Sequence, residues 1–477
     1  MLASCLHLLF FMAKEILTRR KMLLGLTATA GGLAGLGAWK TFQEPGTSQP
    51  EIIKKANLSE PTAPMSYSTN KKNGDKISLL GFGCMRFPVM PGEKSPRSPN
   101  IDAKAVQAMV DYAIAHGVNY FDTGWGYHSG ASQAFIGRAL KHHPRDKFNL
   151  ATKMPGFFKP TLAKAKEYFA SQLKQCQVEY FDYYLLHALS TVPNYKETYE
   201  REGVLDYLLE EKKQGRIRNL GWSFHGDAPM LEYVLNCGVP WDFGMVQLNY
   251  HDMLYKYIPT MRMRRMLPEP APIPWMYSKM VASGLPMIIM EPLLGGRLAR
   301  LNGKALRILQ AARPEDSAAA WAFRYVAGLP NVLTILSGMT YMEHLQDNLQ
   351  IFSPLEPLTP SEELVLKEAL NAFVNASNIR CTTCGYCMPC PYGVDIPGVF
   401  RHHNNCLDDD LVKDARSPEY NTARQAYLAS LARKVPELAT ASHCTGCGQC
   451  ISKCPQFIDI PNEMDKLAKL VRDMTTV

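Results

Sequence analysis

Eight short apolar runs recur along the middle of the chain, and this repeat constrains the fold more than any other feature. Amphipathic stretches such as AKAVQAMVDYAIAHG and LAKAKEYFASQLKQCQ separate them. Eight strand–helix units over about 270 residues predict a closed (β/α)8 barrel at 76–360. A doubly wound sheet is the alternative, but no GxGxxG turn follows the first run. The runs are LLGFGCM, VNYFDTG, FNLATKM, DYYLLHAL, IRNLGWSFH, FGMVQLNY, MIIMEPLLG and VLTILSGM.

Polar side chains stand where several of these runs end, which is where a barrel of this kind carries its function. The second run contains Asp122, with Tyr127 five residues later, the third Lys153 and the fourth His187. Taken singly, each residue has a structural explanation, such as core packing for Tyr127. Because they occur at three successive strand ends, we interpret them together as a site. The fifth and sixth runs add Ser223, His225, Gln247 and Asn249.

With these residues in place, the segment from about Met65 to Asn348 resembles the aldo-keto reductase family. The resemblance implies an NAD(P)-dependent enzyme that transfers a hydride between NADP(H) or NAD(H) and a small-molecule carbonyl or alcohol substrate. Tyr127 would be the proton donor, and a nearby Lys153 ammonium would lower the pKa of its phenol. Asp122 would pair with that ammonium, and His187 would orient the carbonyl.

The same resemblance implies a set of dinucleotide contacts. Met290 stands where many members carry an aromatic residue that stacks on the nicotinamide, and Gln133 replaces a usual Glu. Gly338 and His344 replace the basic or amide residues often found near the adenosine end, which leaves NADP versus NAD open. The implied cofactor-binding residues are Ser223, Gln247, Pro292, Leu293, Gly295, Gly338, Thr340 and Asn348.

Eight of the thirteen cysteines lie in two clustered runs near the C-terminus. The second run has the C-x2-C-x2-C-x3-C-P spacing of bacterial ferredoxins, in which the fourth Cys ligates the other cluster. We therefore predict an iron–sulfur module at 375–470 with two [4Fe–4S] clusters. Zinc and a single cluster are the alternatives, the latter because the last gap of the first run is two residues rather than three. The predicted ligands are Cys381, Cys384, Cys387 and Cys454 for one cluster, and Cys390, Cys444, Cys447 and Cys450 for the other.

The two cysteine runs end in similar text, CPYGVDIP and CPQFIDIP, which indicates an internal duplication. Between them, helical segments such as NTARQAYLASLARK make the region similar to a helical dicluster ferredoxin module. Such a module implies a redox partner protein. The net charge of +8 is spread along the chain without a long basic block, so no nucleic-acid partner is expected.

The N-terminal segment 1–40 places Arg19 and Arg20 before an apolar stretch rich in Gly and Ala. It resembles a twin-arginine export signal, which implies a periplasmic or exported protein that meets the membrane only through this segment. The alternatives are a chance arginine pair before a membrane anchor and a cytoplasmic location. Residues 41–75, with four prolines among polar residues, are predicted to be a linker that ends in a tight hairpin turn at Asn73-Gly74.

Two interpretations of the whole chain remain. In the first, the barrel is an oxidoreductase, and the clusters carry electrons or brace the C-terminus. In the second, the chain is an iron–sulfur electron-transfer or interaction protein, and the barrel is a non-catalytic scaffold. A long proline-bearing loop at 251–275 either covers the barrel pocket or decorates the surface.

Overall fold

The structure is a computed structural model that describes residues 60–61, 63–93, 95–255, 271–374, 378–454, 456 and 458–476. The predicted export signal therefore lies outside the described residues, as do most of the linker and residues 256–270 of the long loop. None of the described helices is long and apolar enough to cross a membrane.

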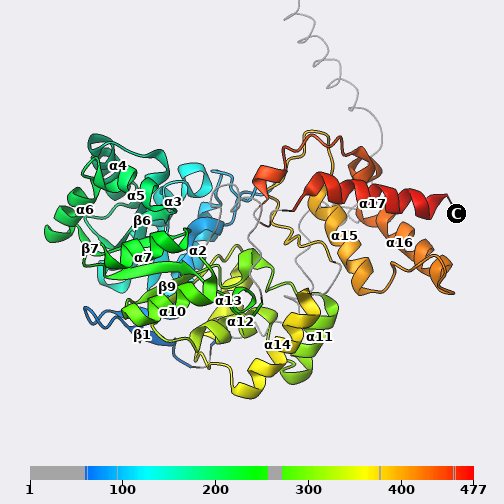
Figure 1. Cartoon of the computed structure of the whole chain (residues 1–477), viewed down its shortest axis with the longest axis horizontal. Helices are drawn as coiled ribbons and strands as arrows, with labels where there is room; N and C mark the ends of the chain where they lie inside the picture. Colours follow the sequence, from blue (N-terminus) through cyan, green and yellow to red (C-terminus); the bar gives the residue numbers. More distant parts are fainter. Residues whose placement is uncertain are drawn as a thin grey trace, which may run out of the picture. The chain divides into compact units, whose positions relative to one another are not determined.

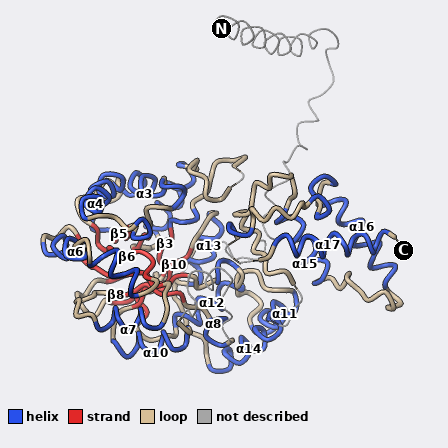
Figure 2. The backbone as a smooth tube through the Cα atoms, turned by 45° about the horizontal axis from the view of Figure 1, so that its top comes forward, coloured by secondary structure: helices blue, strands red, loops and turns tan. Residues whose placement is uncertain are grey.

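Eight parallel strands close into a barrel in the order β10-β3-β4-β5-β6-β7-β8-β9, which confirms the predicted fold class. Figures 1 and 2 show the strands at the centre with the helices outside them. Each strand coincides with one of the eight apolar runs, although β6 starts one residue before its run. The strands are β3 (Leu80–Gly83), β4 (Tyr120–Asp122), β5 (Asn149–Met154), β6 (Phe181–Leu189), β7 (Ile217–Phe224), β8 (Phe243–Gln247), β9 (Met287–Met290) and β10 (Val332–Ser337).

Helices link successive strands, two more follow the last strand, and apolar stripes of the helices pack against the outside of the barrel. A typical start is that of α4, where the Thr161 side chain caps the helix by accepting from the Lys164 backbone N–H. The helices are α2 (Ala103–Ala115), α3 (Ser132–Leu140), α4 (Leu162–Cys176), α5 (Val192–Tyr195), α6 (Val204–Lys213), α7 (Ala228–Asn236), α8 (Tyr250–Leu254), α10 (Ile273–Ser283), α11 (Gly303–Ala312), α12 (Ala318–Ala327), α13 (Met342–Ile351) and α14 (Pro360–Val374).

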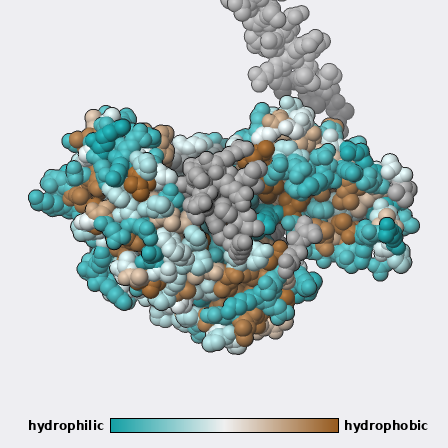
Figure 3. All heavy atoms as spheres, viewed as in Figure 1, coloured by the Kyte–Doolittle hydropathy of each residue, from teal (hydrophilic) through white to brown (hydrophobic). Residues whose placement is uncertain are grey.

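Two apolar clusters result, one inside the barrel and one between the strands and helices. The inner cluster stacks Tyr183 edge-on against Tyr120 and Phe243, with ring centroids 5.2 and 5.1 Å apart. Polar side chains cover much of the face drawn in Figure 3, with smaller apolar patches between them. The inside of the barrel is thus packed solid, which leaves its C-terminal mouth to carry the chemistry.

A hairpin precedes the barrel and packs at the N-terminal ends of its strands. β1 (Tyr67–Thr69) pairs antiparallel with β2 (Lys76–Ser78), so the predicted hairpin is present, but six residues rather than two connect its strands. Its first strand also lies inside the segment predicted to be a linker. The connecting residues also contact the barrel. The Asn73 amide donates to Asp75 at 2.7 Å and to Asn219 of β7 at 2.9 Å.

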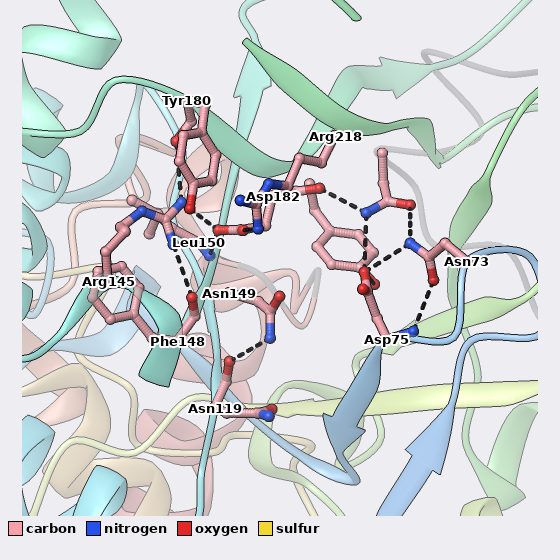
Figure 4. A network of polar contacts seen from close by, with 12 residues as sticks. Asn73, Asp75, Asn119, Arg145, Phe148, Asn149, Leu150, Tyr180, Asp182 and Arg218 are labelled. Carbon is pink, nitrogen blue, oxygen red and sulfur yellow. Dashed lines mark hydrogen bonds and ion pairs between the residues drawn. The ribbon is translucent and has the colours of Figure 1, made fainter. Parts of the chain in front are cut away.

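Asp182, at the start of β6, organises the same end of the barrel (Figure 4). Its carboxylate accepts from Arg145 at 2.6 Å, from the Leu150 backbone N–H at 2.9 Å and from Arg218 at 3.2 Å. Both guanidinium carbons lie 4.0 Å from the centroid of the Tyr180 ring. This network joins β5, β6 and β7 at the end opposite the predicted catalytic residues.

The C-terminal module consists of three helices and two cysteine loops around a small core of its own. Its helices are α15 (Ile396–Asp408), α16 (Tyr420–Lys434) and α17 (Ile460–Thr475). The two DIP sequences play the same part: Asp395 and Asp459 cap α15 and α17, and each proline occupies the first turn. The duplicated sequence thus forms a duplicated loop-to-helix unit.

Candidate active site and cysteine sites

A buried ion pair lies at the C-terminal ends of two neighbouring barrel strands. Lys153 Nζ on β5 donates to Asp122 Oδ1 on β4 at 2.6 Å and to the Thr123 carbonyl at 2.7 Å. Lys153 is only 1% exposed and Asp122 only 3%. Burial lowers the pKa of Lys153, but Asp122 and Tyr127 outweigh it and the pKa is raised overall. The lysine is therefore held charged inside the protein.

Tyr127 lies beside this pair in the turn that follows β4. The Lys153 ammonium is 5.0 Å from the centroid of its ring. A Cβ at Gly124 would come within 3.2 Å of the Tyr127 ring carbons, so a glycine leaves room for the ring to fold back over the strand end. Burial raises the pKa of Tyr127, whereas Lys153 lowers it as predicted. Burial is the larger effect, so the pKa lies above its usual value and the phenol is protonated at neutral pH.

Two histidines stand on the next strands around the barrel. His187 is at the end of β6, and its Nδ1 has no hydrogen-bond partner among the described residues. Burial, together with the charges of Lys153 and His225, holds the pKa of His187 well below its usual range. Burial and Lys153 also lower the pKa of His225 to about 4. Both imidazoles are therefore neutral and can donate or accept a hydrogen bond. The sequence placed His225 at a strand end but gave it no role.

Aromatic side chains border the histidine side of this site. The Phe157 ring meets the His187 ring edge-on, with centroids 5.6 Å apart, although Phe157 is 51% exposed. Phe158 is 57% exposed beside it. Exposed aromatic rings next to a buried polar site are typical of a surface that receives an apolar ligand.

The residues predicted to hold the dinucleotide lie at the C-terminal ends of β7 to β10 or in the segments that follow. The Ser223 hydroxyl accepts from the Ala188 backbone N–H at 2.8 Å. The Asn348 amide, on α13, donates to the Ser337 hydroxyl at the end of β10 at 2.8 Å. Gln247 ends β8, Pro292, Leu293 and Gly295 follow β9, and Gly338 and Thr340 follow β10.

Two departures noted in the sequence have structural partners here. Met290 ends β9 and packs against the inner apolar cluster. Gln133 is buried on α3, and its amide donates to the Thr152 hydroxyl of β5 at 2.8 Å. Gln133 therefore ties a helix to the strand that carries Lys153.

The eight clustered cysteines line two neighbouring cavities in the C-terminal module. Burial raises the pKa of Cys381 to about 12 against the hydrogen bond from the Thr383 N–H, and the neighbouring Cys384 and Cys454 add to the rise. No group of three or more His, Cys, Asp or Glu in the described part of the chain is arranged for a single metal ion. One cavity is lined by Cys381, Cys384, Cys387 and Cys454, and the other by Cys390, Cys444, Cys447 and Cys450, with Cys387 at its edge.

Four thiols around each cavity are the donor set that a [4Fe–4S] cluster requires, so the residues present fit that group. The grouping is the one predicted from the ferredoxin spacing, in which the last cysteine of each run joins the other run. Only the folded loops bring these residues together, because Cys454 is more than sixty residues from its partners along the chain.

Residues 79–363 match the sequence model of the Aldo/keto reductase family, which is more than half of the chain. The chain belongs to the aldo/keto reductase family. Residues 380–460 of this aldo/keto reductase also match a 4Fe-4S dicluster domain, which identifies the C-terminal module.

Known relatives of this aldo/keto reductase resemble only parts of it. It is 32% identical over 158 residues to "Probable aldo-keto reductase 1" of Glycine max, which is 31% of this chain and 42% of the soybean protein. It is 25% identical over 295 residues to "Uncharacterized oxidoreductase YqkF" of Bacillus subtilis strain 168, covering 57% and 87% of the two chains. Among solved structures, aldo-keto reductase AKR11C1 from Bacillus halodurans superposes with a TM-score of 0.48 at 21% identity, covering 64% of this chain and 96% of that one.

In this aldo/keto reductase the C-terminal module touches the barrel at the loops that were predicted to hold the dinucleotide. Gln456 of the module lies against Gly295, where an added Cβ would be 2.5 Å from its amide nitrogen. Tyr386 of the module packs against two barrel arginines, Arg86 at 5.6 Å and Arg97 at 3.8 Å from its ring centroid. Arg86 also packs on Gly338, where a Cβ would be 3.0 Å from its Cδ. Sequence patterns could not predict these contacts, because they join segments that are remote from one another along the chain.

Proposed function

We propose that the barrel is an NAD(P)-dependent oxidoreductase that transfers a hydride between a nicotinamide dinucleotide and a carbonyl or alcohol substrate. The observation that carries this proposal is the buried Asp122–Lys153 pair beside Tyr127. A charged lysine with almost no exposure is costly in a protein interior, and a scaffold has no need of one. Asp122, Tyr127, Lys153 and His187 are the proposed catalytic residues.

In the reducing direction, Tyr127 donates its proton to the carbonyl oxygen as the carbonyl carbon receives the hydride. The nicotinamide, when bound, supplies that hydride. Lys153 stabilises the phenolate that forms on Tyr127, and Asp122 fixes the position of the ammonium. The neutral His187 imidazole donates a hydrogen bond to the same oxygen and orients the carbonyl. Alcohol oxidation uses the same groups in reverse, with Tyr127 as the base.

The proposed dinucleotide contacts are the eight residues on or after β7 to β10 named above. Ser223 and Gln247 are proposed to bind the nicotinamide amide, and the loops after β9 and β10 to bind the phosphates and adenosine. On the substrate side, exposed Phe157 and Phe158 favour a carbonyl compound with an apolar group. The cluster module is proposed to hold two [4Fe–4S] clusters and to exchange electrons with a redox partner protein.

A second function is favoured by the contacts of the module with the dinucleotide loops. If Arg86 on Gly338 and Gln456 on Gly295 exclude a dinucleotide, the chain is an iron–sulfur electron-transfer protein with a barrel scaffold. An anaerobic titration of the full chain with NADPH and NADH, followed by fluorescence, separates the two functions. Saturable binding supports the oxidoreductase, and absence of binding to both supports the scaffold.

Turnover tests the catalytic assignment. With a panel of aromatic and aliphatic aldehydes, Tyr127→Phe is expected to lower kcat by at least about a hundredfold while NADPH binding persists. Tyr168→Phe is the matched control, because it removes a phenol on α4 that is not among the proposed catalytic groups. Equal turnover by wild type and Tyr127→Phe would refute the proton-donor role.

Iron analysis tests the ligand assignment. Cys384→Ser and Cys447→Ser are each expected to lose about half of the iron, because they belong to different cavities. Cys237→Ser, on the barrel, is the control and should keep it all. Loss of all iron in one variant and none in the other would support a single cluster instead.

Export by the twin-arginine route remains our proposal for the N-terminal segment. Replacement of Arg19 and Arg20 by lysine should leave the protein in the cytoplasmic fraction of a bacterial host. An unchanged distribution between fractions would contradict the proposal.

A further inference from the structure

One residue of the first cysteine loop links the proposed cluster to the barrel. The backbone N–H of Thr383 donates to Cys381 Sγ at 3.3 Å. The Thr383 side-chain oxygen accepts a hydrogen bond from Arg300 Nη1 of the barrel. Thr383 has a φ of 53°, in the left-handed region that a β-branched residue rarely adopts. The hydrogen bond from Arg300 helps to hold this conformation, which aims the N–H at the sulfur.

The Arg300 guanidinium lies in the segment between β9 and α11, where the surrounding charges are unusual. Burial and the neighbouring Arg401 lower its pKa. The groups that favour its charged form are the thiols of Cys381 and Cys384 and the phenol of Tyr341. Two of the predicted cluster ligands are thus among the groups that act on Arg300.

The charge of the same guanidinium also acts on the segment proposed to hold the adenosine end of the dinucleotide. Burial lowers the pKa of His344 to about 4; Glu343 opposes this effect, and the charges of Arg300 and Arg86 add to it. His344 Nδ1 accepts from the backbone N–H of Thr340, one of the proposed dinucleotide contacts, at 3.3 Å. Arg300 therefore contacts a cluster ligand loop, and its charge acts on the loop proposed to bind phosphates.

We propose that Arg300 and Thr383 are positioning residues that raise the reduction potential of the cluster bound at Cys381 and make it respond to occupancy of the dinucleotide loops. The tuning by Arg300 needs only the cluster, whereas the response to occupancy rests on the proposed function.

The physical reason is charge. When this cluster takes up one electron and passes from the 2+ to the 1+ state, its negative charge increases. A fixed guanidinium and an N–H···S hydrogen bond both stabilise that extra charge. Anionic phosphates near Arg300 offset its charge, so their binding lowers the potential. By linkage, reduction of the cluster weakens phosphate binding by the same factor.

The test is an anaerobic redox titration of the full chain with its clusters, reduced by dithionite and followed by electron paramagnetic resonance. In Arg300→Gln, the ratio of reduced to oxidised cluster at a fixed potential should fall about tenfold for one cluster, which equals about 59 mV for a one-electron couple. The other cluster should keep its potential. Arg300→Lys keeps the charge and should retain most of the wild-type value.

Two further variants keep the result interpretable. Arg433→Gln removes the same charge from an exposed position on α16 and should leave both potentials unchanged. Thr383→Val keeps the backbone N–H but loses the acceptor for Arg300, and should shift the same cluster in the same direction. If Arg300→Gln loses iron, Thr383→Val decides the question. Unchanged potentials in both Arg300→Gln and Thr383→Val, or equal shifts in Arg300→Gln and Arg433→Gln, overturn the proposal.

ADP-ribose tests the coupling, because it is a redox-inert fragment common to both dinucleotides. It should lower the potential of the same cluster in the wild type but not in Arg300→Gln. Calorimetry measures its binding separately. Binding without a shift overturns the coupling alone, whereas absence of binding overturns both the coupling and the proposed dinucleotide site. In either case the comparison of wild type with Arg300→Gln still decides whether Arg300 tunes the cluster.

Discussion

Replacing Lys153 by Met would leave Asp122 buried without its cation. The carboxylate would lose the 2.6 Å hydrogen bond from Lys153 Nζ, and its other oxygen already lacks a partner among the described residues. Removing one partner of a buried ion pair typically costs about 3–5 kcal/mol. The folded protein can limit this cost by protonating Asp122.

The free energy of protonating Asp122 gives an independent upper limit for that cost. An aspartate of ordinary pKa, about 3.9, costs about 1.36 kcal/mol to protonate for each pH unit above it, or about 4 kcal/mol at pH 7. We therefore expect Lys153→Met to lower the free energy of unfolding by about 4 kcal/mol at pH 7. Burial already raises the pKa of Asp122 in the wild type, where Lys153 opposes that rise, and the variant loses this opposition. The deficit should thus shrink as the pH falls, to about 1.5 kcal/mol at pH 5.

Urea unfolding at pH 7 and pH 5, followed by tryptophan fluorescence, measures these values, because Trp222 and Trp321 are buried in the barrel. The double variant Asp122→Asn/Lys153→Met has no carboxylate at this position and should show a deficit that does not change with pH. If Lys153→Met and wild type differ by the same amount at both pH values, the lysine does not compensate a buried charge and the reasoning fails.

Three other predictions concern different parts of the barrel. Asp182→Ala should destabilise the fold by about 3 kcal/mol in the same urea assay, because it leaves Arg145 without its buried carboxylate; an effect below 1 kcal/mol would contradict this. Phe157→Ala should raise KM for aromatic aldehydes several-fold more than for acetaldehyde; equal changes would exclude an apolar contact. His225→Gln should lessen the loss of stability between pH 6.5 and pH 4. In this range the histidine is protonated in the unfolded chain but stays neutral in the folded protein, whose pKa at this residue is about 4, so it favours unfolding as the pH falls. Parallel stability curves for variant and wild type would refute this.

Much of the barrel could be predicted from the sequence because strand and helix patterns are local. Each of the eight apolar runs became a strand, and the duplicated DIP text became two capped helix starts. The prediction for the linker was less accurate, because six residues connect the hairpin strands where the sequence predicted a two-residue turn at Asn73-Gly74. Turn residues alone did not reveal the contact of Asn73 with Asn219 on β7, which favours the longer connection.

The sequence by itself determined which residues stand at the strand ends and which cysteines share a loop, because both follow from spacing along the chain. Only the tertiary structure decided how the surroundings of these residues change their pKa values and which remote residues contact them. It shows that burial outweighs Lys153 in setting the pKa of Tyr127, and it adds a second neutral imidazole at His225. It also brings Arg300 to Thr383, 83 residues away. Burial and long-range contact depend on how remote segments pack, and no local pattern encodes either one.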